Sequence, residues 1–423
     1  EWTRKLVHFG GGLIAASFPW LFTTHWTVLA LGSAFFLILW ATRRVGLLQS
    51  VHGVARRSEG GLYYPVAVYL LFLIAAQRPV FYLIAILALV LSDTVAAVLG
   101  SQYGRVNYTV EQDRRTLEGS AVFFVSTFLV VHLPLLLLGN VPPALSVLVA
   151  FQIALLMTLF EGISLRGNDN LVVPLMTYFL LLKLTTQEPG FLAYQIAAQL
   201  VIMTLVALVA WRYQFLTASG AMGFMLFFYG AYSLGGEEWT VAPAVALVAY
   251  TAFYLVRCRP QGEADPRYQV VAAFYVSIVP GLLYIANNTF EKVVRVPGFG
   301  EGDPFYAAFL GAVAAQVALV VYHTDPSVAR ADLRAGLVRL GAPVAAFLLI
   351  VPLGLLVGTN RGTSSFVAAG SIVVLAVLVH ALARRLLPLE RLRARDGGPW
   401  MLRVQTVSVA LATALVLPWA VRA

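Results

Sequence analysis

The stretch "PVFYLIAILALVLSDTVAAVLG", residues 79–100, is an apolar run that carries a single charged residue, Asp93, near its end. The run at 79–99 is long enough for a helix to cross a bilayer, which takes about 20 apolar residues. The whole chain of 423 residues is similar, with 60% hydrophobic and 12% charged residues, whereas a soluble domain has about 25% charged residues. The composition therefore excludes an ordinary soluble protein and indicates an integral membrane protein.

We predict an all-α fold, a polytopic bundle of transmembrane helices, because the apolar runs are continuous and do not alternate as barrel strands do. About 15 spans are expected, at 6–22, 26–42, 62–77, 79–99, 119–139, 143–161, 171–185, 190–211, 215–234, 239–257, 269–287, 305–323, 340–357, 364–384 and 401–420. The single cysteine, Cys258, excludes an intrachain disulfide framework and a cysteine-based zinc cluster. Because the first residue is Glu1 and not Met, we expect a short segment to precede it.

Basic residues indicate the orientation of the spans. Most of the 29 Lys and Arg residues lie before the first span and in the loops after every second span. The positive-inside rule places these loops in the cytoplasm, for a protein of the inner or plasma membrane. The net charge of +9 then reflects topology and contact with lipid headgroups. No soluble basic domain is present, so we expect no nucleic-acid partner.

Three acidic residues, Asp93, Glu161 and Asp169, lie close to membrane depth, and all three fall at predicted cytoplasmic ends of spans. An ionisable residue in a span is costly, so each is a candidate for function. The alternative is that each is a structural partner of a nearby arginine. Because three such acids share one membrane face beside basic or glycine-rich loops, we favour the functional interpretation.

The residues after Asp93 form a face with small side chains. Asp93, Ala97, Gly100 and Gly104 follow one another at steps of four, three and four, which places them on one side of a helix. This face has two interpretations. Small residues let a neighbouring helix pack closely, or they leave room for a nucleotide or a metal ion beside the carboxylate.

A basic stretch, "EQDRRTLEGS" at 111–120, follows this helix. It contains Arg114, Arg115, Glu118 and Gly119, which we expect to be flexible. Arginine side chains bind phosphate oxygens in a planar, bidentate manner. A carboxylate, a helix end and paired arginines together are suited to binding a magnesium–triphosphate complex.

The amino-terminal stretch "TRKLVHFGGG", residues 3–12, has compatible chemistry. Lys5 and His8 are three residues apart and therefore share a helical face. For Arg4 and Lys5 the alternative is simple anchoring at the cytoplasmic membrane surface. For His8, about one turn into a span, the alternative is a structural, hydrogen-bonded histidine.

A fourth stretch, "EGISLRGNDNLVVP" at 161–174, begins with Glu161 at the end of a span and has a polar turn with Asp169 and Asn170 before the next span. The turn is compatible with capping of the following helix. Asp and Asn oxygens are also hard ligands suited to Mg²⁺.

These four stretches together resemble the phytol kinase, dolichol kinase and CTP-dependent diacylglycerol kinase family of integral membrane lipid kinases. The resemblance covers about residues 1–190. Its motifs are R-K-x-x-H-x-x-x-G, G-D-x-x-A-x-x-x-G-x-x-x-G, K-S-x-E-G-S and E…D-N-x-x-x-P. They match Arg4, Lys5, His8 and Gly12; Asp93, Ala96, Gly100 and Gly104; Arg115 through Ser120; and Glu161, Asp169, Asn170 and Pro174. Ser92 stands where the family has Gly, Arg115 where it has Lys, and Thr116 where it has Ser. "RRSEGGLYYP", residues 56–65, is similar to the stretch before the third span of phytol kinases.

The resemblance implies transfer of the γ-phosphate of CTP, or of UTP, to an isoprenoid alcohol such as phytol, geranylgeraniol or a polyprenol. Three sets of roles follow. Mg²⁺ would be held by Asp93 and Asp169, with Asn170 and Glu161. The nucleotide would be bound by Arg4, Lys5, Gly100, Gly104, Arg114, Arg115, Gly119 and Ser120. The catalytic residues would be Asp93 and Lys5, with His8 or Glu118 orienting or deprotonating the alcohol. The sequence has no G-x-x-x-x-G-K-[ST] loop, so it is not a P-loop enzyme.

We predict two fused membrane domains, at 1–213 and 214–423. The second resembles a family that includes the plant phytyl-phosphate kinases, in the stretches at 215–224, 268–284 and 358–371. That family carries D-T-W-A-S-E where this chain aligns Leu319 and Val320, and Asp325 and Ser327 are poor substitutes. The predicted span map also places Asn360 on the extracytoplasmic side. Two outcomes stay open: the second domain adds a second phosphate, or it is catalytically inactive.

Two other functions compete with a kinase. Many spans and interrupted helices are also typical of a lipid transporter or flippase, but such proteins carry their polar residues at the midplane. A phosphatidate cytidylyltransferase would use CTP at the same membrane face and would release pyrophosphate. The sequence leaves the oligomeric state undetermined.

Overall fold

The computed structural model describes residues 2–45, 60–111, 113–214, 216–258, 270–290, 305–324, 333–358, 362–386 and 399–420. The chain divides into two compact units, Glu1–Val201 and Ile202–Ala423. The boundary falls inside helix α11 (Pro189–Tyr213), whereas the sequence analysis placed it at the carboxyl end of the same helix.

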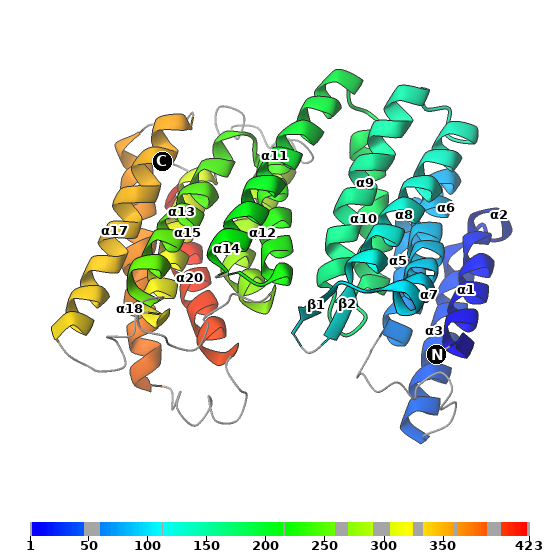
Figure 1. The fold of residues 1–423 in the computed structure, drawn as a ribbon, viewed down its shortest axis with the longest axis horizontal. Helices are drawn as coiled ribbons and strands as arrows, with labels where there is room; N and C mark the ends of the chain where they lie inside the picture. Colours follow the sequence, from blue (N-terminus) through cyan, green and yellow to red (C-terminus); the bar gives the residue numbers. More distant parts are fainter. Residues whose placement is uncertain are drawn as a thin grey trace. The chain divides into compact units, whose positions relative to one another are not determined.

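The first unit is built from helices of very different length (Figure 1). They are α1 (Trp2–Ala16), α2 (Phe18–Leu21), α3 (His25–Val45), α5 (Gly60–Ala75), α6 (Pro79–Leu87), the π-helix η1 (Ala88–Ser92), α7 (Asp93–Tyr103), α8 (Leu117–Leu137), α9 (Pro143–Ile163), α10 (Asp169–Leu184) and the first part of α11.

The second unit is also helical. After α11 it contains α12 (Ala218–Gly230), η2 (Ala231–Gly235), η3 (Glu238–Thr240), α13 (Val241–Phe253), η4 (Tyr254–Cys258), α14 (Val270–Asn288), α15 (Tyr306–Thr324), α17 (Leu333–Val357), α18 (Thr363–Leu386) and α20 (Pro399–Ala420).

The all-α membrane fold predicted from the sequence is confirmed. Each of the fifteen predicted spans coincides with helical residues, because a bilayer requires backbone groups to be satisfied within the segment. Within the described residues, ten helices are long and apolar enough to cross a membrane. Among the other predicted spans, Gly60–Ala75 and Gly341–Val357 are shorter apolar helices. The chain is therefore an integral membrane protein.

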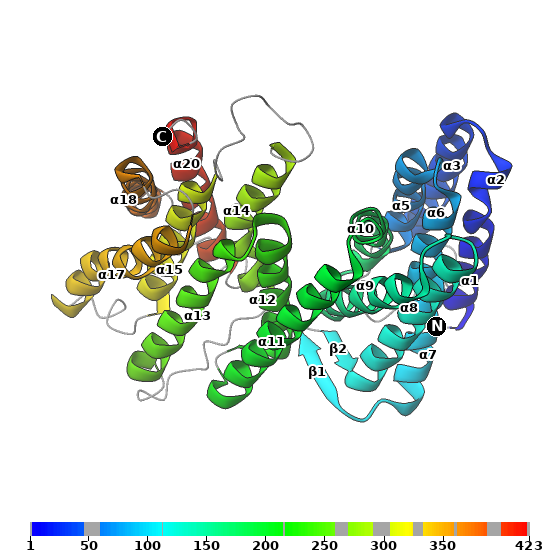
Figure 2. The ribbon, with the colours of Figure 1, turned by 90° about the horizontal axis from the view of Figure 1, so that it is seen from above.

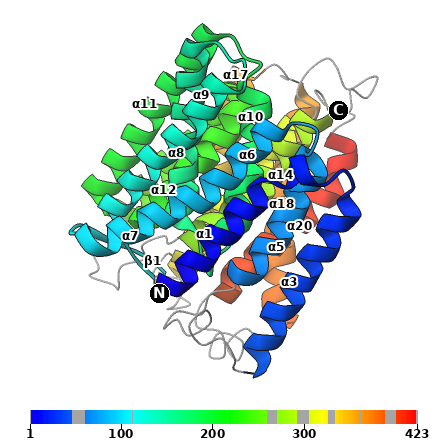
Figure 3. The same cartoon turned by 90° about the vertical axis from the view of Figure 1, so that its right-hand side faces the viewer.

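The core of the first unit lies between α1, α5, α6 and η1, and α1 and α3 face the viewer in Figure 3. Tyr82 of α6 is fully buried and donates a hydrogen bond of 3.0 Å to the carbonyl oxygen of Ala15 in α1. Gly12 of α1 lies against Val90 of η1, where a Cβ atom would come within 2.2 Å of a valine methyl group. Lipid tails are as apolar as these side chains, so close packing holds the helices together.

Helices α6, η1 and α7 form one continuous apolar helix from Pro79 to Tyr103. Its π-helical turn immediately precedes Asp93, and such turns are often found at functional sites. Asp93 is half-buried and lies about 15 Å along the helix axis from Tyr103. The sequence analysis placed Asp93 at the end of the span, and this is corrected because the helix continues beyond residue 99.

Helices α7 and α8 approach closely at two glycines. A Cβ atom on Gly100 would lie 2.9 Å from the Cα atom of Gly119 and 3.1 Å from the hydroxyl of Thr116. A Cβ atom on Gly104 would lie 2.5 Å from the Thr116 methyl group. Thr116 also caps α8, since its hydroxyl accepts a hydrogen bond from the Gly119 amide at 3.1 Å.

These contacts correct the expectation that Gly100 and Gly104 clear space for a nucleotide. The space is filled by α8 and Thr116, so the close-packing interpretation of the small face holds. Gly119 is likewise not a flexible loop residue, because it lies in the first turn of α8 and packs against Gly100.

A short β-hairpin connects α7 to α8, and Figure 2 shows it from above. Strand β1 (Asn107–Val110) pairs antiparallel with β2 (Asp113–Thr116), with Tyr108 opposite Arg115 and Thr109 opposite Arg114. Glu111 in the connecting turn has a φ of 54°. The sequence analysis treated this region as a loop, because strands of four residues lie below what hydrophobic alternation can reveal.

The second unit is organised around α15, whose apolar window is 83% buried. The buried surface of α15 carries small side chains, including those of Ala308, Ala312 and Ala315, which let α17 and α18 approach closely. Tyr306 at its start donates hydrogen bonds of 3.0 Å to the carbonyl oxygens of Glu238 and Gly354.

The close approach of α7 and α8 gives a stability prediction. We expect Gly100→Ala to lower the free energy of unfolding by about 1–2 kcal/mol, because the added methyl group meets the backbone of α8 and outweighs alanine's better helix propensity. Gly11→Ala is the matched control, since its Cβ atom would meet nothing within 4 Å. Thermal unfolding in detergent measures both variants. Equal midpoints for the two would contradict this packing.

Candidate active site

The four sequence motifs come together at one end of the first unit, where Figure 1 also shows the N-terminus and the β-hairpin. Four contacts between distant parts of the chain connect them: Arg115 with Glu161, Asn170 with Gly60, His8 with Tyr64, and Gly100 with Gly119. The site is therefore assembled from α1, α5, α7, the hairpin, the end of α9 and the start of α10.

Arg115 joins the hairpin to the end of α9. Its guanidinium forms an ion pair with Glu161, and the two side chains are only 12% and 14% exposed. A second guanidinium nitrogen donates to the hydroxyl of Ser164 at 2.7 Å and to its carbonyl oxygen at 3.2 Å. Ser164 is the residue at which α9 ends. A largely buried arginine with this many bonds fixes the turn between α9 and α10.

Arg114 and Arg115 do not act as a pair, which corrects the expectation from the sequence. They are successive residues of β2, so their side chains point to opposite faces of the hairpin. Arg114 is exposed, whereas Arg115 is engaged by Glu161. Of these two arginines, Arg114 is the one whose side chain is accessible to a ligand.

Glu118 closes the hairpin at its base. Both of its carboxylate oxygens accept from the amide of Val106, at 3.1 and 3.2 Å. Ser120, one turn into α8, shares a hydrogen bond of 2.9 Å with the hydroxyl of Tyr108 in β1. Both residues therefore hold the hairpin against α8.

Asn170 joins the start of α10 to the start of α5. It is 8% exposed, and its amide donates a hydrogen bond of 2.8 Å to the carbonyl oxygen of Gly60. A Cβ atom on Gly60 would lie 2.7 Å from the Asn170 amide nitrogen, so a larger residue here would displace the Asn170 side chain. Asp169, the first residue of α10, accepts a hydrogen bond of 3.1 Å from the Asn170 backbone amide.

His8 lies on α1 one turn before Gly12, and its ring meets the edge of the Tyr64 ring at a centroid distance of 5.0 Å. Arg4 and Lys5 lie on the same helix, but their side chains fall outside the described residues.

The predicted magnesium ligands are not gathered into a cluster of acids. Within the described part of the chain, no group of three or more His, Cys, Asp or Glu residues is arranged to hold a metal ion. Glu161 is neutralised by Arg115, and the Asn170 amide nitrogen is bonded to Gly60. Mg²⁺ commonly uses only one or two carboxylates and completes its shell with phosphate oxygens and water. The assignment of Asp93 and Asp169 as magnesium ligands stays a prediction, whereas the carboxylate of Glu161 is already paired with Arg115.

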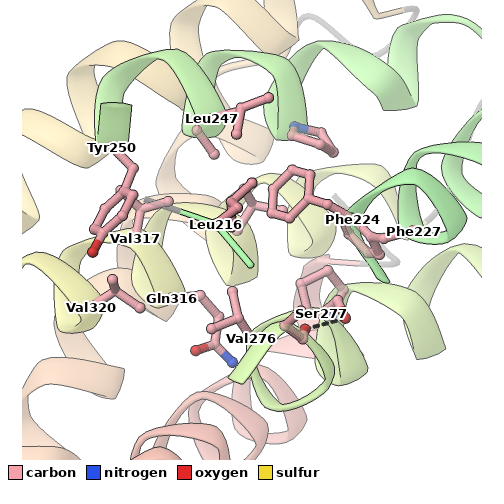
Figure 4. Close-up of a pocket in the computed structure, with 15 residues that line it drawn as sticks. Leu216, Phe224, Phe227, Leu247, Tyr250, Val276, Ser277, Gln316, Val317 and Val320 are labelled. Atoms are coloured by element: carbon pink, nitrogen blue, oxygen red, sulfur yellow. Dashed lines mark hydrogen bonds between the residues drawn. The ribbon is translucent and has the colours of Figure 1, made fainter. Parts of the chain in front are cut away.

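The second unit contains an apolar cavity, shown in Figure 4. Its walls come from α12, α13, α14 and α15, and include Phe224, Leu247 and Val276. Two polar residues of the lining are engaged elsewhere: Ser277 donates to the carbonyl oxygen of Ala273 at 2.6 Å, and Gln316 accepts from the Gln405 amide at 2.7 Å.

The two residues that align with an acidic motif, Leu319 and Val320, are both buried in α15. Leu319 and Val320 are 3% and 5% exposed, and Val320 lines the cavity. The predictions about Asp325, Ser327 and Asn360 lie outside the described residues. The aligned position is therefore part of an apolar interior.

The sequence analysis did not identify Ser164, Gly60 or Tyr64 as site residues. Ser164 binds Arg115 partly through its backbone, which no side-chain pattern reveals. Gly60 and Tyr64 lie in "GGLYYP", a stretch that the sequence analysis matched to phytol kinases only by similarity. A buried tyrosine in an apolar helix is indistinguishable from core without its neighbours.

The fold and the site define an integral membrane protein with a polar, partly basic site at one end of its first helical unit. The chain is 32% identical over 177 residues to phytol kinase of Synechocystis sp., across 41% of this chain and 76% of that protein. It is 29% identical over 98 residues to dolichol kinase sec59 of Schizosaccharomyces pombe, across 23% of this chain and 18% of that protein. No protein-family model and no solved structure matches the chain. The chain belongs to the phytol kinase family.

The ion pair generates a prediction that separates the two arginines. Arg115→Ala leaves the Glu161 carboxylate without its partner, and we expect it to lower the free energy of unfolding by about 3 kcal/mol. Arg114→Ala, at an exposed position of the same strand, should change it by less than about 0.5 kcal/mol.

Thermal unfolding in detergent measures both effects. The double variant Arg115→Met with Glu161→Leu removes both charges and should recover much of the loss, since no charge is then left unpaired. Similar stability of the two single variants would show that the ion pair does not hold the hairpin to α9.

Proposed function

We propose that the protein is a membrane kinase that transfers the γ-phosphate of CTP, or of UTP, to the hydroxyl group of an isoprenoid alcohol. The main support for this proposal is the 32% sequence identity between this chain and a phytol kinase, across 76% of that protein's length. The assembly of all four motifs at one end of one unit supports it. Phytol, geranylgeraniol and polyprenols are the proposed acceptors.

In the proposed reaction the alcohol oxygen attacks the γ-phosphorus of the nucleotide. The bond from that phosphorus to the bridging oxygen of the β-phosphate breaks, so CDP leaves with that oxygen. The proton of the alcohol passes to His8, and the products are an isoprenyl monophosphate and CDP. Such transfers depend mainly on positioning and on stabilisation of charge.

The residues divide these tasks as follows. Lys5, Arg4 and the exposed Arg114 would neutralise the triphosphate. Asp93 and Asp169 would hold Mg²⁺, which neutralises charge on the phosphate oxygens when bound. Arg115, Glu161 and Asn170 are assigned to positioning, because each is engaged by another part of the protein. We also propose that this end of the unit faces the cytoplasm, where nucleotides are found, in agreement with the distribution of basic residues.

For the second unit we propose a role without phosphoryl transfer. The support is that Leu319 and Val320, at the aligned acidic position, are buried apolar residues. No observation favours the phosphatidate cytidylyltransferase or the lipid transporter over the kinase.

The test uses the purified full chain in liposomes with Mg²⁺, γ-labelled CTP and, in parallel, phytol, geranylgeraniol, a polyprenol and diacylglycerol. We expect label in the monophosphate of an isoprenoid alcohol. Label in a diphosphate would contradict an inactive second unit. Release of pyrophosphate instead of CDP would indicate a cytidylyltransferase, and absence of any nucleotide binding would favour a transporter.

A variant tests the assignment of Asp93. Asp93→Asn removes the charge of a proposed metal ligand, and we expect it to lower turnover at least about 100-fold. Glu188→Gln is the control, because Glu188 is exposed beyond the opposite end of α10. Unfolding midpoints show that both variants are folded. Near-normal turnover of folded Asp93→Asn would remove this residue from the site.

A further inference from the structure

One turn of α5 lies between two motif segments. Gly60 accepts a hydrogen bond from Asn170 of α10, and Tyr64 meets His8 of α1 at a ring-centroid distance of 5.0 Å with the ring planes 62° apart. Gly60 and Tyr64 are four residues apart and therefore share a face of α5. The residue that links the proposed base to the rest of the site is thus Tyr64.

The hydroxyl group of Tyr64 differs from those of other buried tyrosines of this unit. Tyr64 is 7% exposed, and its hydroxyl has no hydrogen-bond partner among the described residues. Tyr82 and Tyr178, which are also buried, donate to the carbonyl oxygens of Ala15 at 3.0 Å and Ile74 at 2.8 Å. Buried tyrosine hydroxyls normally find a partner. A phenylalanine would fill the same space, so the Tyr64 hydroxyl points to a ligand.

The residues around Tyr64 indicate which chemical group this ligand carries. Helix α5 has the sequence "GGLYYPVAVYLLFLIA", which contains no charged residue. Phosphate groups are bound by cations, whereas a neutral phenol in an apolar setting suits a neutral hydroxyl group attached to a hydrocarbon. The position beside His8 places such a hydroxyl next to the proposed base.

We propose that the Tyr64 hydroxyl donates a hydrogen bond to the hydroxyl oxygen of the isoprenoid alcohol and positions it beside His8. This inference rests on the proposed function. Tyr64 keeps its proton throughout, and the alcohol proton passes to His8 as the new oxygen–phosphorus bond forms. Tyr64 is therefore a substrate-binding residue that selects an alcohol over the corresponding hydrocarbon.

The test compares Tyr64→Phe with Tyr82→Phe in the full chain. Tyr64→Phe removes a hydroxyl that has no hydrogen-bond partner among the described residues, so we expect its unfolding midpoint to equal or exceed that of the wild type. Its kcat/KM for phytol should fall roughly tenfold, the value of one hydrogen bond, with the KM for CTP unchanged. Tyr82→Phe should show the converse: a lower unfolding midpoint, because the Ala15 carbonyl loses its donor, and near-normal kinetics of the folded protein.

A second measurement separates this inference from the proposed function. Phytol and phyt-2-ene share the same carbon skeleton and double bond and differ only by the hydroxyl group, so the extra thermal stabilisation that phytol gives over phyt-2-ene reports binding of that group without any catalysis. We expect the difference in the wild type and its loss in Tyr64→Phe. If the wild type lacks kinase activity but shows this pattern, the proposed function fails and the alcohol site stands.

Three results would overturn the inference. One is wild-type kinetics of Tyr64→Phe. Another is a kinetic defect that appears in the KM for CTP. The third is an equal preference for phytol over phyt-2-ene in the wild type and in Tyr64→Phe.

Discussion

The ion pair between Arg115 and Glu161 is the contact on which the rest of the candidate site depends. It joins the hairpin after α7 to the end of α9, and the same guanidinium holds Ser164, where the chain turns toward α10. The position of Asp169 and Asn170 follows from that turn, and the position of α5 follows from the bond between Asn170 and Gly60. A charge pair that is this buried is costly to break, because either partner alone would be left without compensation.

Small residues set the distances within this framework. Gly100 and Gly119 let α7 and α8 approach backbone to backbone, and Gly12 of α1 makes room for the Val90 side chain of η1. In a bilayer, where burial of apolar surface gives little net attraction between helices, such contacts provide much of the packing energy. They also bring the start of α8, with its capping Thr116, against the helix that carries Asp93. The same small residues therefore determine both how these helices pack and where the start of α8 lies relative to the helix that carries Asp93.

The helices were predictable because each apolar run is long and continuous, and the bilayer leaves little alternative to a helix. The details of the site were not. The sequence "RRTLEGS" suggests two arginines that act together, but a four-residue strand directs Arg114 and Arg115 to opposite faces. Gly100 and Gly104 were compatible with close packing or with an open nucleotide site, because both require the same residue type. Only the neighbours of Tyr64 distinguish it from an ordinary core aromatic residue.

The central claim is that one end of the first unit binds the nucleotide, at the segments that the Arg115–Glu161 pair holds together. Hydrogen exchange followed by mass spectrometry tests it directly, with the full chain in lipid nanodiscs, Mg²⁺ and a non-hydrolysable CTP analogue. The account predicts slower exchange at residues 105–120 and 161–170, with the second unit unchanged. Protection confined to the second unit, or unchanged exchange at both segments in protein that binds the analogue, would contradict it.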